Sequence, residues 1–245
     1  MSDGLARIDV AVLAGGLGTR LKGVLGATTP KVLAPIHGRP FLDHLLDWLA
    51  GYGARRVVLC LGHLAEQVSA HLAAAPPARL HVTTVIEPQP LGTAGALRLA
   101  RSALTSDPVL VLNGDTWLDA DLAGFADRHR ASGALASLLC VTVDDASRYG
   151  RVELDDSGHV LRFVEKDPDH AGPGIVSAGV VLISAALLER MDSMPGPSLE
   201  CDVLQKLPPR SIRADIAPGA FIDIGTPASL DAASGIIPDR AASFY

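Results

Sequence analysis

Aromatic, cysteine and basic residues are all scarce in this chain of 245 residues. Aromatic side chains make up only 4% of the residues and apolar residues 48%, so the core must consist mainly of leucine, valine and alanine. The net charge is −6 and lysine and arginine form no cluster, which argues against nucleic acid or an anionic membrane as a partner. A small anionic ligand is still compatible with this composition, because it needs only a local positive site.

The cysteines and the apolar runs indicate the compartment in which the protein is expected. Cys60, Cys140 and Cys201 are far apart and show no C-x-x-C spacing, which predicts free thiols rather than disulfides or a zinc site. The longest uncharged apolar stretch, residues 175–188, is too short and too interrupted to span a bilayer. The first ten residues, MSDGLARIDV, lack the apolar core of a signal peptide. We therefore expect a cytoplasmic protein.

Strand and helix patterns alternate along the chain. Strands separated by crossover helices form parallel sheets with both faces covered. The first part has apolar strand patterns at 8–14, 55–61, 80–86 and 108–115, with helical patterns at 41–53, 63–75 and 94–104 between them. The second part is less regular, with strands at 134–143 and 175–184, a hairpin within 151–166, short helices near 185–191 and 199–206, strands in SIRADI and FIDIG, and a helix from Pro227.

No linker, low-complexity tract or internal repeat interrupts this pattern. The hexapeptide repeat of a β-helix domain is also missing, so no C-terminal β-helix is expected. The prediction is a single α/β domain of Rossmann-like type over residues 1–245. Its central sheet should be mixed but mostly parallel, with helices on both faces.

A glycine-rich segment, AGGLGTRLKGVLGATTPK at residues 14–31, follows the first predicted strand. Glycines let backbone N–H groups approach and surround an anion at the carboxyl edge of a parallel sheet. The segment does not match a Walker loop, and Leu21 stands where the dinucleotide fingerprint requires its third glycine. On the glycines alone, an ordinary turn and a phosphate site are equally well supported.

The pairing of GGLGTRL (15–21) with PKVLAPI (30–36) resembles the signature of the sugar-1-phosphate nucleotidylyltransferases. These enzymes join a nucleoside triphosphate to a sugar 1-phosphate and release pyrophosphate. LKGV at 21–24 is most similar to the branch that makes GDP-activated manno-heptose, which implies GTP and D-glycero-α-D-manno-heptose 1-phosphate as substrates. Further matches in the family's order are PLGTAGA (90–96), NGD (113–115), RYG (148–150), VEK (164–166) and FIDIG (221–225).

The chemistry of this reaction requires cations more than a base. A sugar 1-phosphate is already an anionic nucleophile, so the barrier comes from bringing two anions together and stabilising charge around the α-phosphorus. The resemblance implies the phosphate-handling residues: Gly15, Gly16, Gly18 and Thr19 around the triphosphate, Arg20 as its clamp, Lys31 at the α-phosphoryl group and the leaving pyrophosphate, and Lys166 on the sugar phosphate.

Asp115 and Asp223 each end an apolar strand segment. An aspartate in such a position is often only a cap of the next turn or helix. Two carboxylates that the fold brings together suit Mg²⁺, and in the resembling family the matching pair holds the catalytic Mg²⁺. The resemblance thus divides the domain into a nucleotide-binding half, about 8–115, and a half for the sugar phosphate and second metal ligand, about 116–236.

The choice of base and sugar involves a further set of residues. Guanine presents two adjacent N–H donors, which the carboxylate of Glu87 can accept, so Glu87 favours guanine. Ser177 stands where many relatives have asparagine, which leaves the identity of the sugar open. Glu200 fits either a place near the sugar or a helix cap with Ser198. The resemblance also implies Gly92 and Thr93 on the nucleotide with Asp115, and Asn113, Gly150 and Glu165 with Ser177 on the sugar.

Several alternatives stay open at this point. Within the class, the acceptor can be mannose 1-phosphate, and the donor UTP, dTTP or CTP. A glycosyltransferase would use Asp115 to hold the metal of a nucleotide-sugar. A nucleotide-sugar has no γ-phosphate, however, so the GTR and PK motifs would have nothing to clamp. A non-catalytic nucleotide-sugar sensor should have lost Arg20, Lys31 or one aspartate of the metal pair, and none is lost. A homo-oligomer is compatible with the sequence, which contains nothing that decides it.

Overall fold

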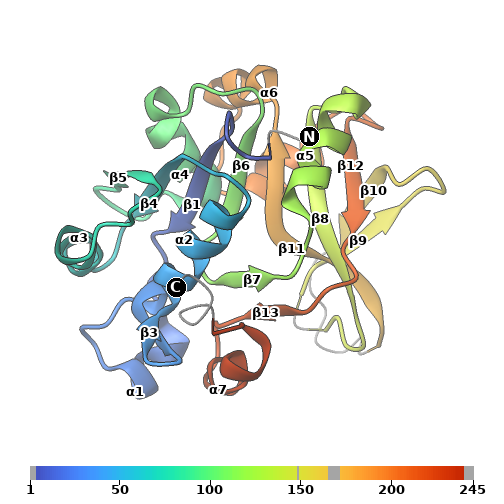
Figure 1. Ribbon diagram of the computed structural model, residues 1–245. Helices are drawn as coiled ribbons and strands as arrows, with labels where there is room; N and C mark the ends of the chain where they lie inside the picture. The colour runs from blue at the N-terminus through green and yellow to red at the C-terminus, as the bar shows by residue number, and fades with distance from the viewer. Residues whose placement is uncertain (1–3, 148, 165–171, 240–245) are drawn as a thin grey trace.

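The computed structural model describes residues 4–147, 149–164 and 172–239, which are built around a mixed β-sheet (Figure 1). Strand β1 (Asp9–Ala14) lies inside the sheet and pairs in parallel with β4 (Arg56–Leu61) and β6 (Val109–Asn113). Strand β5 (His81–Ile86) pairs in parallel with β4 and forms one edge. The first half of the chain thus contributes four parallel strands to the sheet, as predicted.

The second half of the chain extends the same sheet. Strand β11 (Gly174–Ile183) runs antiparallel to β6 and also pairs with β8 (Ala136–Val143). Strand β12 (Ile212–Ile216) pairs in parallel with β8. The hairpin of β9 (Arg151–Leu154) and β10 (Val160–Val164) joins the first part of β11 through β9. The mixed, mostly parallel sheet of one α/β domain is therefore confirmed.

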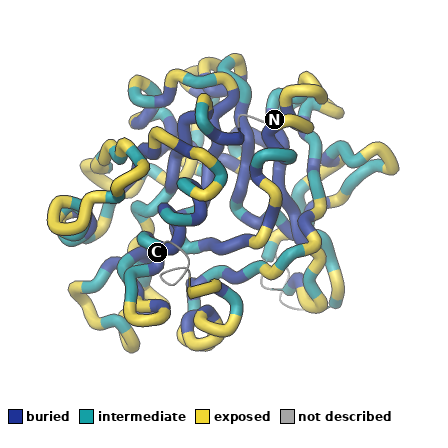
Figure 2. The backbone as a smooth tube through the Cα atoms, viewed as in Figure 1, coloured by how far each residue is buried: buried dark blue, intermediate teal, exposed yellow. Residues whose placement is uncertain are grey.

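Helices cover both faces of the sheet, because successive strand residues point to opposite sides. Val10 and Val12 belong to one buried cluster, to which α2 (Phe41–Gly51) and α5 (Leu122–Ser132) contribute. Ala11 lies in the other cluster, together with residues of α4 (Gly92–Ala100) and α6 (Ala185–Arg190). Figure 2 shows the strands mostly buried between these layers. The remaining α-helices are α1 (Lys22–Leu25), α3 (Ala65–Ala74) and α7 (Pro227–Ile236).

The structure also contains short elements that the patterns did not predict in this form. The predicted helix at 199–206 is a π-helical turn, Leu199–Val203, followed by a 3₁₀ turn, Leu204–Lys206. Strand β7 (Thr116–Leu118) was not predicted, and it forms a separate ribbon with β13 (Phe221–Asp223). The other short elements are the 3₁₀ turns at 19–21, 31–33, 101–103 and 191–193, and the strand pair β2 (Pro35–Ile36) and β3 (Arg39–Pro40).

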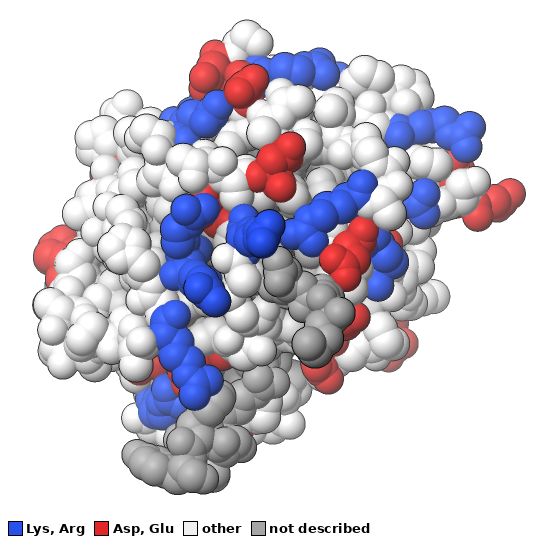
Figure 3. All heavy atoms as spheres, turned by 45° about the horizontal axis from the view of Figure 1, so that its top comes forward, with Lys and Arg blue, Asp and Glu red and all other residues white. Residues whose placement is uncertain are grey.

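The cysteines and the surface agree with the sequence analysis. All three cysteines are free thiols, and burial is the main cause that raises the pKa of Cys60 and of Cys140 to about 12, which disfavours their thiolate forms. On the face shown in Figure 3, Lys and Arg side chains stand beside Asp and Glu side chains. Within the ranges given above, no helix is both long and apolar enough to cross a membrane.

His129 makes the stability of the folded protein depend on pH. The side chain is only 5% exposed and its Nδ1 lies 2.8 Å from the hydroxyl oxygen of Ser137, so burial lowers the pKa of the imidazole below 6.5. The His129 imidazole therefore binds a proton more readily in the unfolded chain than in the folded protein. We expect stability to fall as the pH drops below about 6.5, by at most about 1.4 kcal/mol per pH unit from this group.

Urea unfolding of the wild type and of His129→Gln between pH 5 and 7.5 measures this contribution. Glutamine keeps a polar group near Ser137 and does not titrate. The variant should lose less stability than the wild type as the pH falls. The same dependence on pH in both proteins would contradict the role of His129.

Candidate active site

The loops after four parallel strands meet at one edge of the sheet. The register pairs Leu13 of β1 with Asn113 of β6, and Ala14 of β1 with Leu61 of β4. The Gly114 N–H also donates to the Leu13 carbonyl at 2.8 Å, which ties the NGD turn to the end of β1. Such an edge is where open α/β sheets bind ligands, so the predicted motifs converge in a suitable place.

The glycine-rich loop leaves β1 at this edge. Gly15 has a packing role, because a Cβ there would come within 2.7 Å of the Glu87 carboxylate oxygen Oε1. Gly18 has φ of 58° and turns the chain into the 3₁₀ turn Thr19–Leu21, whose Leu21 is buried. The loop thus brings its own backbone N–H groups beside Glu87, with Thr19 and Arg20 exposed at its far end.

A two-stranded ribbon brings the two predicted metal ligands together. In the β7–β13 ladder, Thr116 pairs with Asp223, and the Ile224 N–H donates to the Asp115 carbonyl at 2.9 Å. Burial and the negative charge of Asp115 raise the pKa of Asp223. The Gly225 N–H donates to Asp223 Oδ1 at 2.5 Å and, together with nearby cations, partly counteracts this rise in pKa. Asp115 and Asp223 are therefore close enough for the charge of one to affect the ionisation of the other.

The two predicted cations of the opening motif lie beside this carboxylate pair. The Lys31 ammonium forms an ion pair with Asp115 Oδ2, and both side chains are largely shielded from solvent. The positive charges of Lys31 and Arg20 both offset part of the rise in the pKa of Asp223. The site therefore combines two carboxylates and two cations from segments that are distant in sequence.

The carboxylate pair suits a magnesium ion. Across the described residues, no group of three or more His, Cys, Asp and Glu side chains forms a metal cage. Mg²⁺ typically takes one or two carboxylates and fills its other positions with phosphate oxygens and water. Asp115 and Asp223 thus match an ion that binds together with a phosphorylated substrate.

Glu87 lies in the wall of a cleft of about 350 Å³. Its N–H donates to the Leu61 carbonyl at 2.8 Å, and its Oε2 accepts the Leu91 N–H at 2.8 Å. Gly92 begins α4 with φ of 73°, and a Cβ there would meet the Pro197 carbonyl oxygen at 2.5 Å. The cleft is lined by Leu13, Gly15, Gly16, Leu17, Glu87, Pro90, Gly92, Thr93, Ala96, Asn113 and Asp115.

A second cavity of about 190 Å³ adjoins this cleft. The two share Leu13, Thr93 and Asn113 in their linings. The second cavity also has Val111, Gly179, Val181, Ser198, Leu199 and Glu200 in its lining. One ligand can therefore extend from the cleft beside Asp115 past Asn113 into the second cavity.

The other sequence-predicted residues lie in several different places. Ser177 and Gly150 line neither of these two cavities; Ser177 pairs with Cys140 between β11 and β8, and Gly150 is exposed near the Val164 carbonyl. Thr93 lines both cavities, and its Oγ1 accepts the Leu199 N–H at 2.8 Å. Glu165 and Lys166 fall outside the described residues.

Glu200 is not part of the helix cap that Ser198 makes. The Ser198 hydroxyl oxygen accepts the Cys201 N–H at 3.1 Å, and the Ser198 N–H donates to Asp202 Oδ2 at 2.9 Å. Asp202 therefore takes the reciprocal position in this cap. Glu200 lines the second cavity instead, and its place near the sugar stays a prediction.

Sequence reasoning missed the apolar lining of the two cavities and the function of Gly179. Leu13 lies two residues before Gly15 and Leu17 lies between Gly16 and Gly18, and this proximity to the glycines is the signal that could have identified them. Gly179 has φ of 67° at an irregularity of β11, and a Cβ there would lie 2.4 Å from Asn113 Nδ2. Its small size thus leaves room for the Asn113 side chain.

Comparison with known proteins agrees with the geometry. A family model described as nucleotidyl transferase matches residues 10–239. The structure of HddC from Yersinia pseudotuberculosis superimposes with a TM-score of 0.82 and 35% identity, covering 93% of this chain and 98% of that one. A second HddC structure, described as complexed with GMP-PN, has a TM-score of 0.81 and 34% identity, with the same coverage.

A curated relative extends well beyond the matched region. The mannose-1-phosphate guanylyltransferase catalytic subunit beta of Drosophila pseudoobscura pseudoobscura is 34% identical over 221 residues. The match covers 88% of this chain and 58% of that protein. This chain thus spans less than two thirds of that relative.

Substitution of Gly179 tests whether its small size leaves room for the Asn113 side chain. Gly179→Ala must move Asn113 and also strain a backbone of positive φ, whereas Gly133 has φ of 64° and open space around its Cβ position. We expect Gly133→Ala to lose about 1 kcal/mol of stability from strain. Gly179→Ala should lose about 1–3 kcal/mol more, because of the clash. Urea unfolding of both variants measures the difference, and equal losses would show that Asn113 is not constrained by Gly179.

Proposed function

This chain belongs to the nucleotidyl transferase family, and we propose that it transfers GMP from GTP to a sugar 1-phosphate. One observation carries the proposal: Asp115, Asp223 and Lys31 meet beside the glycine-rich loop at the carboxyl edge of the sheet. Two carboxylates for a cation and two cations for phosphates are what a reaction between two phosphorylated substrates requires. Arg20 supplies the second of these cations.

In the proposed reaction, a phosphate oxygen of the sugar 1-phosphate forms a bond to the α-phosphorus of GTP. The bond from this phosphorus to the bridging oxygen of the β-phosphate breaks, and pyrophosphate leaves with that oxygen. The sugar phosphate is already ionised, so no residue has to remove a proton. Lys31 and Arg20 offset the repulsion between the two anions, and the loop beginning at Gly15 offers backbone N–H groups to the triphosphate.

We also propose that Asp115 and Asp223 hold one Mg²⁺. The bound ion would supply positive charge next to the phosphates, which lowers the barrier to in-line displacement. Within the chain itself, Lys31 neutralises Asp115, and the positive charge of Arg20 acts on Asp223. The glycosyltransferase alternative would leave this concentration of cations without a triphosphate to bind.

Guanine and a manno-configured sugar are the proposed specificities. Glu87 offers a carboxylate at the cleft, and a structural neighbour is described as a complex with GMP-PN, a guanine nucleotide. The proposed acceptor is D-glycero-α-D-manno-heptose 1-phosphate, from the LKGV and RYG motifs. Mannose 1-phosphate is the second candidate, because a curated relative is named for that activity. Roles of Gly150, Glu165, Lys166 and Ser177 at the sugar belong to this proposal, as does a cytoplasmic location with its supply of GTP.

Pyrophosphate release tests the reaction. The enzyme is assayed with Mg²⁺, each of ATP, GTP, UTP, CTP and dTTP, and the 1-phosphates of glucose, mannose and manno-heptose. We expect release with GTP and a manno-configured acceptor, abolished by EDTA. Asp115→Asn and Asp223→Asn should each lower kcat/KM at least about 100-fold, since each removes a charge from the metal site.

Asp119→Asn is the matched control, because Asp119 is an exposed aspartate four residues beyond Asp115 and lines neither cavity. This variant should keep wild-type activity. No release with any pair of substrates would overturn the proposal. Attention would then turn to the glycosyltransferase and sensor alternatives, beginning with the binding of intact GDP-sugars.

Glu87→Gln tests the choice of base. Glutamine keeps the size of the side chain, and its carbonyl can still accept the Leu91 N–H, but its amide adds a donor where guanine also presents donors. We expect kcat/KM with GTP to fall about 10- to 100-fold relative to that with UTP. The measurement is the ratio of the two kcat/KM values with one acceptor sugar. An unchanged ratio would show that Glu87 does not select the base and only stabilises its loop through the hydrogen bond with Leu91.

A further inference from the structure

Strand β5 forms an exposed edge of the central sheet. Among the residues that the structure describes, it pairs with β4 alone. Its sequence, HVTTVI, contains no proline, glycine, lysine or acidic residue, and five of its six side chains are β-branched. Natural proteins usually protect a sheet edge with charges, prolines or bulges, because its outward N–H and C=O groups can pair with another strand. The edge at β5 lacks these protections and is suited to pairing with a further strand.

The hydrogen bonds to β4 determine which backbone groups of β5 point outward. The His81 N–H donates to the Arg55 carbonyl at 2.7 Å, at the start of β5. Residues along a strand bond alternately to one side and to the other, so the odd-numbered residues of β5 bond to β4. The N–H and C=O groups of Val82, Thr84 and Ile86 therefore point away from the sheet.

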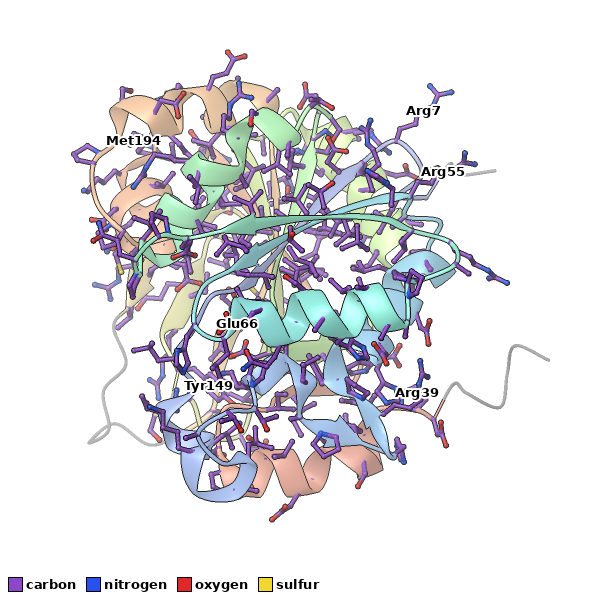
Figure 4. The ribbon with its side chains drawn as sticks, turned by 90° about the vertical axis from the view of Figure 1, so that its left-hand side faces the viewer. Arg7, Arg39, Arg55, Glu66, Tyr149 and Met194 are labelled. Atoms are coloured by element: carbon purple, nitrogen blue, oxygen red, sulfur yellow. The ribbon has the colours of Figure 1, made fainter. Side chains whose placement is uncertain are left out.

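A groove of about 390 Å³ lies between α3 and this edge. Leu72 and Leu80 line it beside Val82 and Thr84 of β5. Figure 4 looks onto this face, where β5 runs alongside α3. Because side chains alternate along a strand, Ile86 stands on the same face as Val82 and Thr84, and it is 54% exposed. The strand thus has an apolar groove beside its first residues and an exposed apolar side chain at its end.

We propose that β5 pairs with β5 of a second copy of this chain, antiparallel about a two-fold axis at Thr84. Pairing through the outward groups places Thr84 opposite Thr84 of the other copy, and Val82 opposite Ile86. Opposed residues of an antiparallel ladder have their side chains on the same face. Each Ile86 therefore enters the groove of the other copy, and the two central sheets become one continuous sheet.

The charges at the two ends of this face are complementary in such a dimer. Arg55 is exposed beside the start of β5, and Glu66 is exposed in the first turn of α3. Helix α3 begins after β4 ends at Leu61, which pairs with Ile86, so Glu66 lies at the opposite end from Arg55 (Figure 4). A two-fold axis at Thr84 brings the Glu66 end of each copy toward the Arg55 end of the other. A parallel pairing would instead bring like charges together.

Charge substitutions at the two-fold axis test this arrangement. Thr84 is exposed, so Thr84→Lys and Thr84→Glu are compatible with folding. In analytical ultracentrifugation, we expect the wild type to sediment as a dimer and each variant alone as a monomer, because like charges then stand opposite one another. An equimolar mixture of the two variants should restore the dimer, since opposite charges meet in it. Thr142→Lys, at an exposed threonine of β8, is the control and should remain dimeric.

A second pair of variants tests the insertion of Ile86 into the groove. Ile86→Ala should raise the dissociation constant of the dimer at least about 10-fold, because each dimer loses two apolar contacts. Ile216→Ala is the matched control, since Ile216 is 50% exposed on β12, and its dissociation constant should equal that of the wild type.

The outcomes separate this inference from the proposed reaction, since none of the measurements depends on activity. A monomeric wild type would overturn the inference and leave a strand of a different protein as the occupant to test. A dimer that persists in both Thr84 variants would overturn it as well, because another surface would then hold the copies together. Two monomeric variants whose mixture stays monomeric would overturn the two-fold pairing at Thr84.

Discussion

The parallel register of β1 with β4 and β6 is the constraint on which the site depends. It aligns Leu13 with Asn113 and Ala14 with Leu61, so loops that are far apart in sequence leave the sheet side by side. The Leu13 carbonyl accepts the Gly114 N–H at the point where the strands end. A slip of one residue would move Val10 and Val12 into the cluster on the opposite face of the sheet, where Ala11 packs, so the apolar core holds this alignment.

The charges at this edge balance one another only in part. Lys31 pairs with Asp115, whereas the pKa of Asp223 is raised by burial and by the neighbouring carboxylate. Holding both carboxylates close together costs free energy unless a cation accompanies them. Lys31 and Arg20 offset part of this repulsion, and the part that is left favours a divalent ion that binds together with a phosphorylated ligand.

Local patterns in the sequence predicted the elements with strong signals. The four parallel strands, the glycine-rich loop and the PK motif all rest on residues close together in the chain, where periodicity and turn chemistry operate. Strand β7 was not predicted, because a strand of three residues shows no measurable periodicity. The approach of Asp223 to Asp115 depends on that ribbon, so only the family resemblance predicted it. Arg98 donates to the carbonyls of Met194 and Gly196, just before the segment that lines the second cavity, and no local pattern can indicate these contacts.

The distribution of charge gives the site a direction. Cations lie at the Lys31 end, and Asn113 lies between the cleft and the second cavity. A ligand with one phosphate and several hydroxyls has lower energy with its phosphate at the cationic end than in the reverse orientation. In the proposed reaction, these cations would attract the acceptor and orient it for attack on the α-phosphorus. Orientation of this kind lowers a barrier without any group that transfers a proton.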